Sequence, residues 1–69
     1  MPDHPELLNH LKAFRTRAAL TQAELAERVG VSRKTINTVE NGVFVPSTIL
    51  ALKLAAALDV SVEQLFQLP

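Results

Sequence analysis

Apolar residues recur along the chain at the spacing of helices, and a residue suited to begin a helix stands before each run. Near the N-terminus, the spacing i, i+4, i+7 and i+11 is met by one apolar stripe, which consists of Leu7, Leu11, Phe14 and Ala18. Asp3, with Glu6 three residues later, fits a capping box ahead of this stripe, and Pro5 is tolerated in a first helical turn. We therefore expect a first helix of about 13 residues that opens at Asp3.

Four further helices are predicted from hydroxyl residues at N-cap positions, namely Thr21, Ser32, Ser47 and Ser61. Two of these caps belong to capping boxes, in which Glu24 and Gln64 are the reciprocal partners. The fifth helix is short and should continue through Leu65 and Phe66.

The ends of the middle helices are marked just as clearly. Gly30 should end the second helix and Asn41-Gly42 the third, because glycine takes a left-handed conformation without strain. The fourth helix should run to about Leu58, where Asp59 can adopt the left-handed conformation at modest cost. Lengths of about 8, 9, 11 and 6 residues after the first helix predict a compact all-α domain of five helices.

The residues expected to face the interior follow the same periodicity. In the second and third helices these residues are Ala23, Leu25, Ala26, Val29, Ile36 and Val39. In the fourth helix they are Leu50, Leu54 and Leu58, with Ala51 and Ala55 beside them. A chain of 69 residues has room for one core, so we expect a single domain over residues 1–69.

The composition argues against several classes of protein. Because cysteine is absent, neither a disulfide framework nor a thiolate metal site is expected, and two glycines are too few for a phosphate-cradling loop. The longest uncharged apolar stretch, 42–52, is shorter than the roughly 20 residues that cross a membrane. The first residues are polar and acidic, unlike a signal peptide, so a soluble cytoplasmic protein is expected.

The net charge of zero gives no sign of the basic excess that is usual in nucleic-acid-binding proteins. The charges are nevertheless unevenly distributed along the chain. Basic residues in the first half include Lys12, Arg15, Arg17, Arg33 and Lys34. Asp59 and Glu63 lie near the C-terminus. The balance therefore permits one basic face without demanding it.

The segment 21–42 combines two short helices and a tight turn that contains Gly30, which is the helix-turn-helix arrangement. In such a pair the second helix enters the DNA major groove. With Ile36 and Val39 turned inward, the N-terminal half of that helix leaves four side chains facing outward, those of Arg33, Lys34, Asn37 and Thr38. All four can donate to base edges or phosphates, and none is acidic.

Over about residues 7–67 the chain resembles the phage repressor and Cro-type helix-turn-helix family, the XRE-like transcriptional regulators. The matching residues in the central part are Leu20-Thr21-Gln22-Ala23-Glu24-Leu25-Ala26, Gly30-Val31-Ser32, Thr35-Ile36, Glu40-Asn41-Gly42 and Pro46-Ser47. The last two helices add Leu54-Ala55, Ala57-Leu58 and Val60-Ser61. The resemblance is therefore carried by a set of motifs and not by one short match.

The resemblance implies roles for individual residues. Base reading falls to the outward residues of the third helix, with Arg33 or Lys34 paired to guanine and Asn37 to adenine. DNA phosphates would be contacted by Gln22, through its side chain and its backbone N–H, and by Thr21, Asn41 and Arg15. Arg15 and Glu40 also resemble the family's buried ion pair, which ties the first helix to the end of the third.

Simpler interpretations stay open for the same residues. Arg33 and Lys34 could be an ordinary solvated pair, and Gln22 could be only a good helix former. His4 and His10 lack the spacing and the cysteine partners of a metal site, so no metal or cofactor is expected. No serine is combined with a base in a pattern typical of an enzyme, and no small-molecule site is evident.

The chain departs from the family in its apolar residues. The loop after Gly42 reads Val43-Phe44-Val45, where relatives are often basic or polar, and Lys53 is the only charge within 48–58. Ile49, Leu52 and Ala56 should form a second apolar face of the fourth helix, and an exposed stripe of this kind suggests a partner surface. A homodimer interface is therefore expected among Phe44, Ile49, Leu52, Val62 and Phe66. Alternatively, Phe44 and Ile49 fold back over the core.

Together these observations predict a sequence-specific regulator that binds double-stranded DNA, acting as a repressor and as a homodimer on an inverted-repeat operator. The alternative is a protein-interaction module on the same fold, such as an antitoxin that binds a partner protein. The exposed apolar residues and the zero net charge favour the alternative. The outward face of the third helix argues against it as the sole role.

Overall fold

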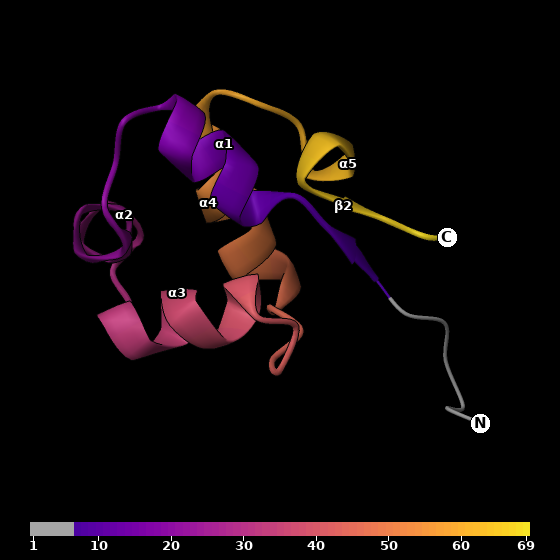
Figure 1. The fold of residues 1–69 in the computed structure, drawn as a ribbon, viewed down its shortest axis with the longest axis horizontal. Helices are drawn as coiled ribbons and strands as arrows, with labels where there is room; N and C mark the ends of the chain where they lie inside the picture. Colours follow the sequence, from indigo (N-terminus) through magenta and orange to yellow (C-terminus); the bar gives the residue numbers. More distant parts are fainter. Residues whose placement is uncertain (1–6) are drawn as a thin grey trace.

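The computed structural model describes residues 7–69. Five helices and two short strands are present in this part of the chain: β1 (Leu8–Asn9), α1 (Leu11–Arg17), α2 (Gln22–Val29), α3 (Arg33–Glu40), α4 (Thr48–Leu58), α5 (Val62–Leu65) and β2 (Phe66–Gln67). The fold is thus mostly helical, as predicted, with a small strand pair added. Figure 1 shows α2 nearly end-on and α3 lying in the plane of the view, so these two helices cross at a large angle.

The predicted hydroxyl caps begin four of the helices. In each, the side-chain oxygen accepts a hydrogen bond of 3.0–3.1 Å from a backbone N–H three residues later, at Thr21, Ser32, Ser47 and Ser61. The reciprocal bonds of Glu24 and Gln64 complete both capping boxes. Because these bonds satisfy N–H groups that have no partner within the helix, they fix where each helix starts.

Left-handed residues mark the predicted ends of the helices. Gly30 has φ of 75° after α2, and Gly42 has φ of 73° just beyond α3. Asp59 ends α4 with φ of 56°, as expected. A fourth left-handed residue, Ala19, was not predicted; it has φ of 60° and lies between α1 and α2.

The first helix is shorter than predicted. It has seven residues and begins at Leu11, because the preceding segment is used in long-range contacts. Leu8 and Asn9 pair in antiparallel fashion with Gln67 and Phe66, and the His10 N–H donates to the Leu65 carbonyl at 2.8 Å. The predicted capping box at Asp3 and Glu6 lies outside the described residues.

The side chain of Asn9 strengthens this arrangement. Its amide nitrogen donates to the Val39 carbonyl at 2.6 Å, and its oxygen accepts from the Leu11 N–H at 3.0 Å. The two bonds join the start of α1 to the end of α3. The same pairing shortens α5 to four residues, because Phe66 is a strand residue and not helical as predicted.

The core lies between α4 and the surrounding helices. Its fully buried large residues are Leu11, Leu25, Ile36, Val39, Leu54 and Leu65. The predicted inward residues of α4 are all buried. Two predicted interior residues, Ala18 and Ala23, are instead exposed, and Leu20 and Phe66 take part in the core. None of the helices in residues 7–69 is long and apolar enough to cross a membrane.

Candidate nucleic-acid interface

The segment 21–42 forms the predicted helix-turn-helix. The Val31 N–H donates to the Ala26 carbonyl at 3.0 Å across the left-handed Gly30, which closes the turn. Ile36 and Val39 are fully buried and hold α3 against the core. The opposite side of α3 is therefore turned toward solvent.

Arg33, Lys34 and Asn37 are exposed on this side of α3, as predicted. The one salt bridge within residues 7–69 joins Arg15 and Glu40, so neither Arg33 nor Lys34 has its charge compensated by a carboxylate there. Two uncompensated positive charges at the start of a helix are unfavourable with respect to the helix dipole. The two charges therefore do not contribute to the stability of α3.

Thr38 is less available than the other three. It is half-buried, and its hydroxyl donates to the Thr35 carbonyl at 2.9 Å. The hydroxyl proton is therefore engaged, and Thr38 can offer only its oxygen lone pairs and its methyl group to a base.

Arg15 and Glu40 form the expected ion pair in the interior. Arg15 Nε lies 2.5 Å from Glu40 Oε2, Nη2 lies 3.2 Å from Oε1, and Nη1 donates to the Leu20 carbonyl at 2.8 Å. The side chains are 10% and 3% exposed. The hydrogen bonds and charge of Glu40 raise the pKa of Arg15 against the opposing effect of burial. The phosphate contact expected of Arg15 is therefore disfavoured, because the side chain is buried and each of its three nitrogens already donates within the protein.

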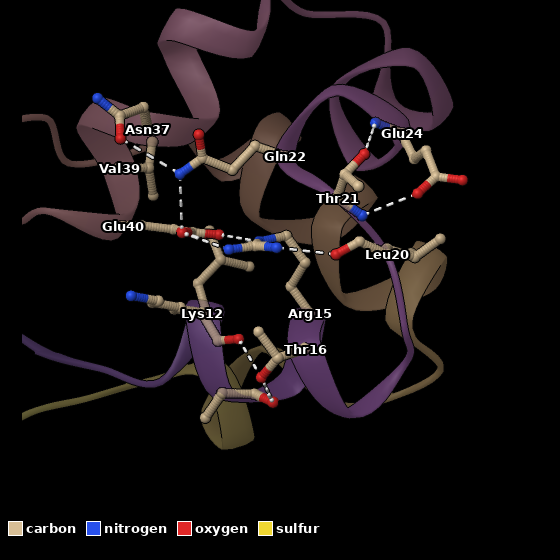
Figure 2. A network of polar contacts seen from close by, with 12 residues as sticks. Lys12, Arg15, Thr16, Leu20, Thr21, Gln22, Glu24, Asn37, Val39 and Glu40 are labelled. Atoms are coloured by element: carbon tan, nitrogen blue, oxygen red, sulfur yellow. Dashed lines mark hydrogen bonds and ion pairs between the residues drawn. The ribbon is translucent and has the colours of Figure 1, made fainter.

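A polar cluster connects this ion pair to the exposed side of α3. Gln22, the first residue of α2, donates from Nε2 to Glu40 Oε1 at 3.1 Å and to Asn37 Oδ1 at 3.2 Å. Asn41 Nδ2 donates to the same Asn37 oxygen at 3.2 Å. Figure 2 shows Gln22 lying between Asn37 and Glu40. The sequence did not predict this cluster, although the i, i+3 and i, i+4 spacing of Asn37 to Glu40 and Asn41 places the three side chains together.

This cluster changes how Gln22 could contact a phosphate. Both N–H groups of its side-chain amide are engaged, and the free amide oxygen cannot donate to an anion. The backbone N–H of Gln22 is in the first turn of α2, where no carbonyl of the helix can accept it. The backbone N–H is therefore the one donor of Gln22 that remains available to a phosphate.

The neighbouring capping box leaves a second donor. Thr21 Oγ1 accepts from the Glu24 N–H at 3.0 Å, and the Thr21 N–H donates to Glu24 Oε1 at 2.9 Å. The hydroxyl proton of Thr21 stays available for a phosphate. The hydrogen bonds from Thr21 lower the pKa of Glu24, whose side chain is exposed at this end of α2.

The expected dimer residues are distributed over two grooves. Leu52, Val62 and Phe66 lie around a groove of about 390 Å³ that Leu7 and Val45 also line. Phe44 and Ile49 line a second groove of about 310 Å³.

The exposure of these residues differs widely. Ile49, Leu52 and Phe44 are 68%, 57% and 48% exposed, so Phe44 and Ile49 do not fold back over the core. Phe66 is only 8% exposed and belongs mainly to the core. The apolar surface open to a partner therefore runs along α4 and the loop before it.

No three histidine or acidic side chains gather as metal ligands anywhere in residues 7–69. His10 stands alone at the start of α1, and His4 lies outside the described residues.

The fold and the exposed basic side of α3 define a class of protein, the DNA-binding regulators built on a helix-turn-helix. The comparisons with known proteins agree with this class. The sequence profile described as Helix-turn-helix matches residues 11–65. The chain belongs to this helix-turn-helix family of DNA-binding transcriptional regulators, which is not a class of enzymes.

Individual relatives are similar over most of their length. The uncharacterized HTH-type transcriptional regulator YgzD of Bacillus subtilis is 42% identical over 60 residues, which cover 87% of this chain and 91% of that protein. The restriction-modification controller protein C.AhdI from Aeromonas hydrophila is 36% identical, with a TM-score of 0.76 over 80% of this chain and 83% of its own. The P22 c2 repressor, solved in complex with a synthetic operator, is 31% identical, with a TM-score of 0.76 over 78% and 82%.

Proposed function

We propose that the protein is a repressor that binds double-stranded DNA sequence-specifically, as a homodimer on an inverted-repeat operator. The observation that carries the proposal is the outward side of α3, where Arg33, Lys34 and Asn37 are exposed on a helix held rigidly by Ile36 and Val39. Rigid support of this kind fixes the register in which base edges are met. The similarity to the P22 c2 repressor, which was solved with an operator, supports the same role.

Phosphate contacts would place α3 in the groove. The backbone N–H of Gln22 and the hydroxyl of Thr21 lie together at the start of α2, where the helix dipole also favours an anion. Asn41 is exposed just after α3, and one N–H of its side-chain amide remains free to contact the DNA backbone on the other side of the groove. Contacts of this kind orient the protein but do not read sequence.

Homodimer formation is proposed from the apolar surface of α4. Leu52 and Val62, beside the groove that Leu7 lines, would pack against the same surface of a second copy. A two-fold axis there would present two α3 helices to half-sites about one helical turn apart, roughly 34 Å. A dimer would remove exposed apolar side chains such as Leu52, which is 57% exposed, from contact with water. Repression requires only that the operator be occupied.

The proposal is tested by DNA binding of single-residue variants to a duplex selected by the wild-type protein. Arg33→Ala should weaken binding by about 1–3 kcal/mol and relax the preference at one base pair. If Lys34 contacts a phosphate, Lys34→Ala should weaken binding to all sequences and reduce the salt slope by about 1. Lys53→Ala removes an equal charge from α4 and should change neither. Equal effects of all three variants would contradict a specific role of α3.

The second candidate function is a protein-interaction module, such as an antitoxin, on the same fold. It is favoured by the exposed Phe44, Ile49 and Leu52 and by the zero net charge. Salt separates the two functions, because contacts to phosphates weaken steeply as salt rises and an apolar protein interface changes little. Leu52→Glu should abolish dimerisation or partner binding without disturbing α3.

A further inference from the structure

We infer that the polar cluster behind α3 fixes the orientation of the Asn37 amide, so that this position selects a keto base, guanine or thymine, over an amino base. The inference rests on the proposed DNA-binding function and adds to it the base preference of one position. It follows from the donors and acceptors of five side chains, those of Arg15, Glu40, Gln22, Asn37 and Asn41.

The orientation is set first in the interior. The guanidinium of Arg15 has only donors and keeps its charge at any pH at which the protein is folded. It donates to both carboxylate oxygens of Glu40, at 2.5 and 3.2 Å. The Glu40 side chain is 3% exposed, and both of its carboxylate oxygens act as acceptors in this ion pair.

Gln22 transmits this constraint to the surface. Glu40 Oε1 lies 3.1 Å from the amide nitrogen of Gln22, and the reversed amide would set oxygen against the carboxylate. With its nitrogen turned inward, Gln22 has one N–H left, which is donated to Asn37 Oδ1 at 3.2 Å. The amide oxygen of Gln22 points away from both partners in Figure 2.

Asn37 can then take only one orientation. Its oxygen accepts from Gln22 and from Asn41 Nδ2, each at 3.2 Å, which uses both lone pairs. The reversed amide would bring its own NH₂ against that of Gln22. The Asn37 nitrogen has no hydrogen-bond partner in residues 7–69, and Figure 2 shows it pointing away from the cluster.

The consequence for base reading follows from the major-groove pattern. Guanine O6 and thymine O4 accept hydrogen bonds, whereas adenine N6 and cytosine N4 are donors. The adenine pairing expected from the sequence needs the oxygen and the nitrogen of one amide, and here the oxygen is occupied inside the protein. The position facing Asn37 therefore prefers a keto base by about 2- to 10-fold, the range expected of a single hydrogen bond.

The test is selection of duplexes from a random pool, followed by competition binding of all four base pairs at each position of the selected site. The position facing Asn37 is the one at which the Asn37→Ala variant loses its preference. The wild-type protein should prefer guanine or thymine there. Asn37→Asp keeps the acceptor for Gln22 and replaces the outward donor with an acceptor, so its preference should move to cytosine or adenine.

A second variant tests the connection through the cluster. Gln22→Met keeps the length of the side chain but removes the hydrogen bond that orients the Asn37 amide. The amides of Asn37 and Asn41 can then rotate together. At the base pair that faces Asn37, the preference for a keto base over adenine should therefore fall several-fold. A change in phosphate contact would instead lower affinity uniformly across sequences. Circular dichroism establishes that each variant is folded.

Three results would overturn the inference and leave the proposed function intact. They are a wild-type preference for adenine or cytosine at the Asn37 position, no position affected by Asn37→Ala, and an unchanged keto preference in folded Gln22→Met. Failure of the folded wild-type protein to select any sequence would overturn the proposed function, and this inference with it.

Discussion

Replacement of Glu40 by glutamine should destabilise the protein far more than the loss of a surface charge. The carboxylate is 3% exposed, and it neutralises a guanidinium that is 10% exposed. Glu40→Gln leaves the positive charge of Arg15 buried without its counterion. Removal of one partner of a buried ion pair costs about 3–5 kcal/mol. We expect a value near 3, because the amide oxygen of glutamine can still accept one of the guanidinium bonds.

That loss is large for a chain of this size. At about 0.05–0.15 kcal/mol per residue, 69 residues have a free energy of unfolding of roughly 3–10 kcal/mol. A loss of 3 kcal/mol, at about 4–8 °C per kcal/mol, should lower the melting temperature by about 12–24 °C. The variant would then be partly unfolded at ambient temperature if the wild-type protein is near the lower limit.

The assay is urea and thermal unfolding followed by far-UV circular dichroism, at several protein concentrations so that dimerisation is separated from folding. Glu27→Gln, on the exposed side of α2, loses the same charge and should stay within about 0.5 kcal/mol of the wild type. The double variant Arg15→Met with Glu40→Gln should recover part of the stability, since no uncompensated buried charge remains. A melting temperature of Glu40→Gln equal to that of Glu27→Gln would refute the reasoning.

Three further predictions concern local structure. Ala19→Gly should raise the free energy of unfolding by about 0.5–1 kcal/mol, because the strain of a left-handed alanine exceeds the conformational entropy that glycine loses on folding. As a control, Ala18→Gly should lower the free energy of unfolding, because Ala18 has an unstrained φ of −79°. Ser47→Ala should cost about 1 kcal/mol in urea unfolding, through loss of the α4 cap. The hydrogen bonds of Thr21 lower the pKa of Glu24 from 4.5. The Glu24 carboxylate therefore stabilises the fold above pH 4.5, and this stabilisation disappears as the pH falls through the lowered pKa. Glu24→Gln should accordingly flatten the acid side of the stability profile, and an unchanged acid limb would contradict this.

Local signals in the sequence predicted most of the helical fold. Each hydroxyl cap acts on an N–H three residues away, so Ser32 and Ser47 could be placed without knowledge of the rest of the molecule. The same holds for Gly30, whose conformation depends on its own backbone. The ion pair of Arg15 with Glu40 is not local, and it was predicted only through the resemblance to a family.

The errors arise where distant segments compete with a local preference. The apolar stripe that begins at Leu7 is compatible with a helix. In the structure, however, Asn9 pairs with Phe66 in an antiparallel strand, so this part of the backbone is extended and not helical. Ala23 is apolar but small, and its exposure depends on how α2 lies against its neighbours.

Within the candidate site, the residue types of α3 could be predicted, whereas the availability of their atoms could not. The donors of Gln22 and Thr38 are occupied by partners that the sequence pattern does not reveal. The orientation of the Asn37 amide likewise depends on a cluster assembled from α1, α2 and α3.

The most direct test of the central claim is selection of bound sequences by the folded wild-type protein from a random duplex pool at near-physiological salt. The account predicts enrichment of an inverted repeat, with half-sites about 10–10.5 base pairs apart, centre to centre, or a multiple of that spacing. No enrichment, from protein shown to be folded, would contradict it and leave the apolar surface of α4 as the functional site.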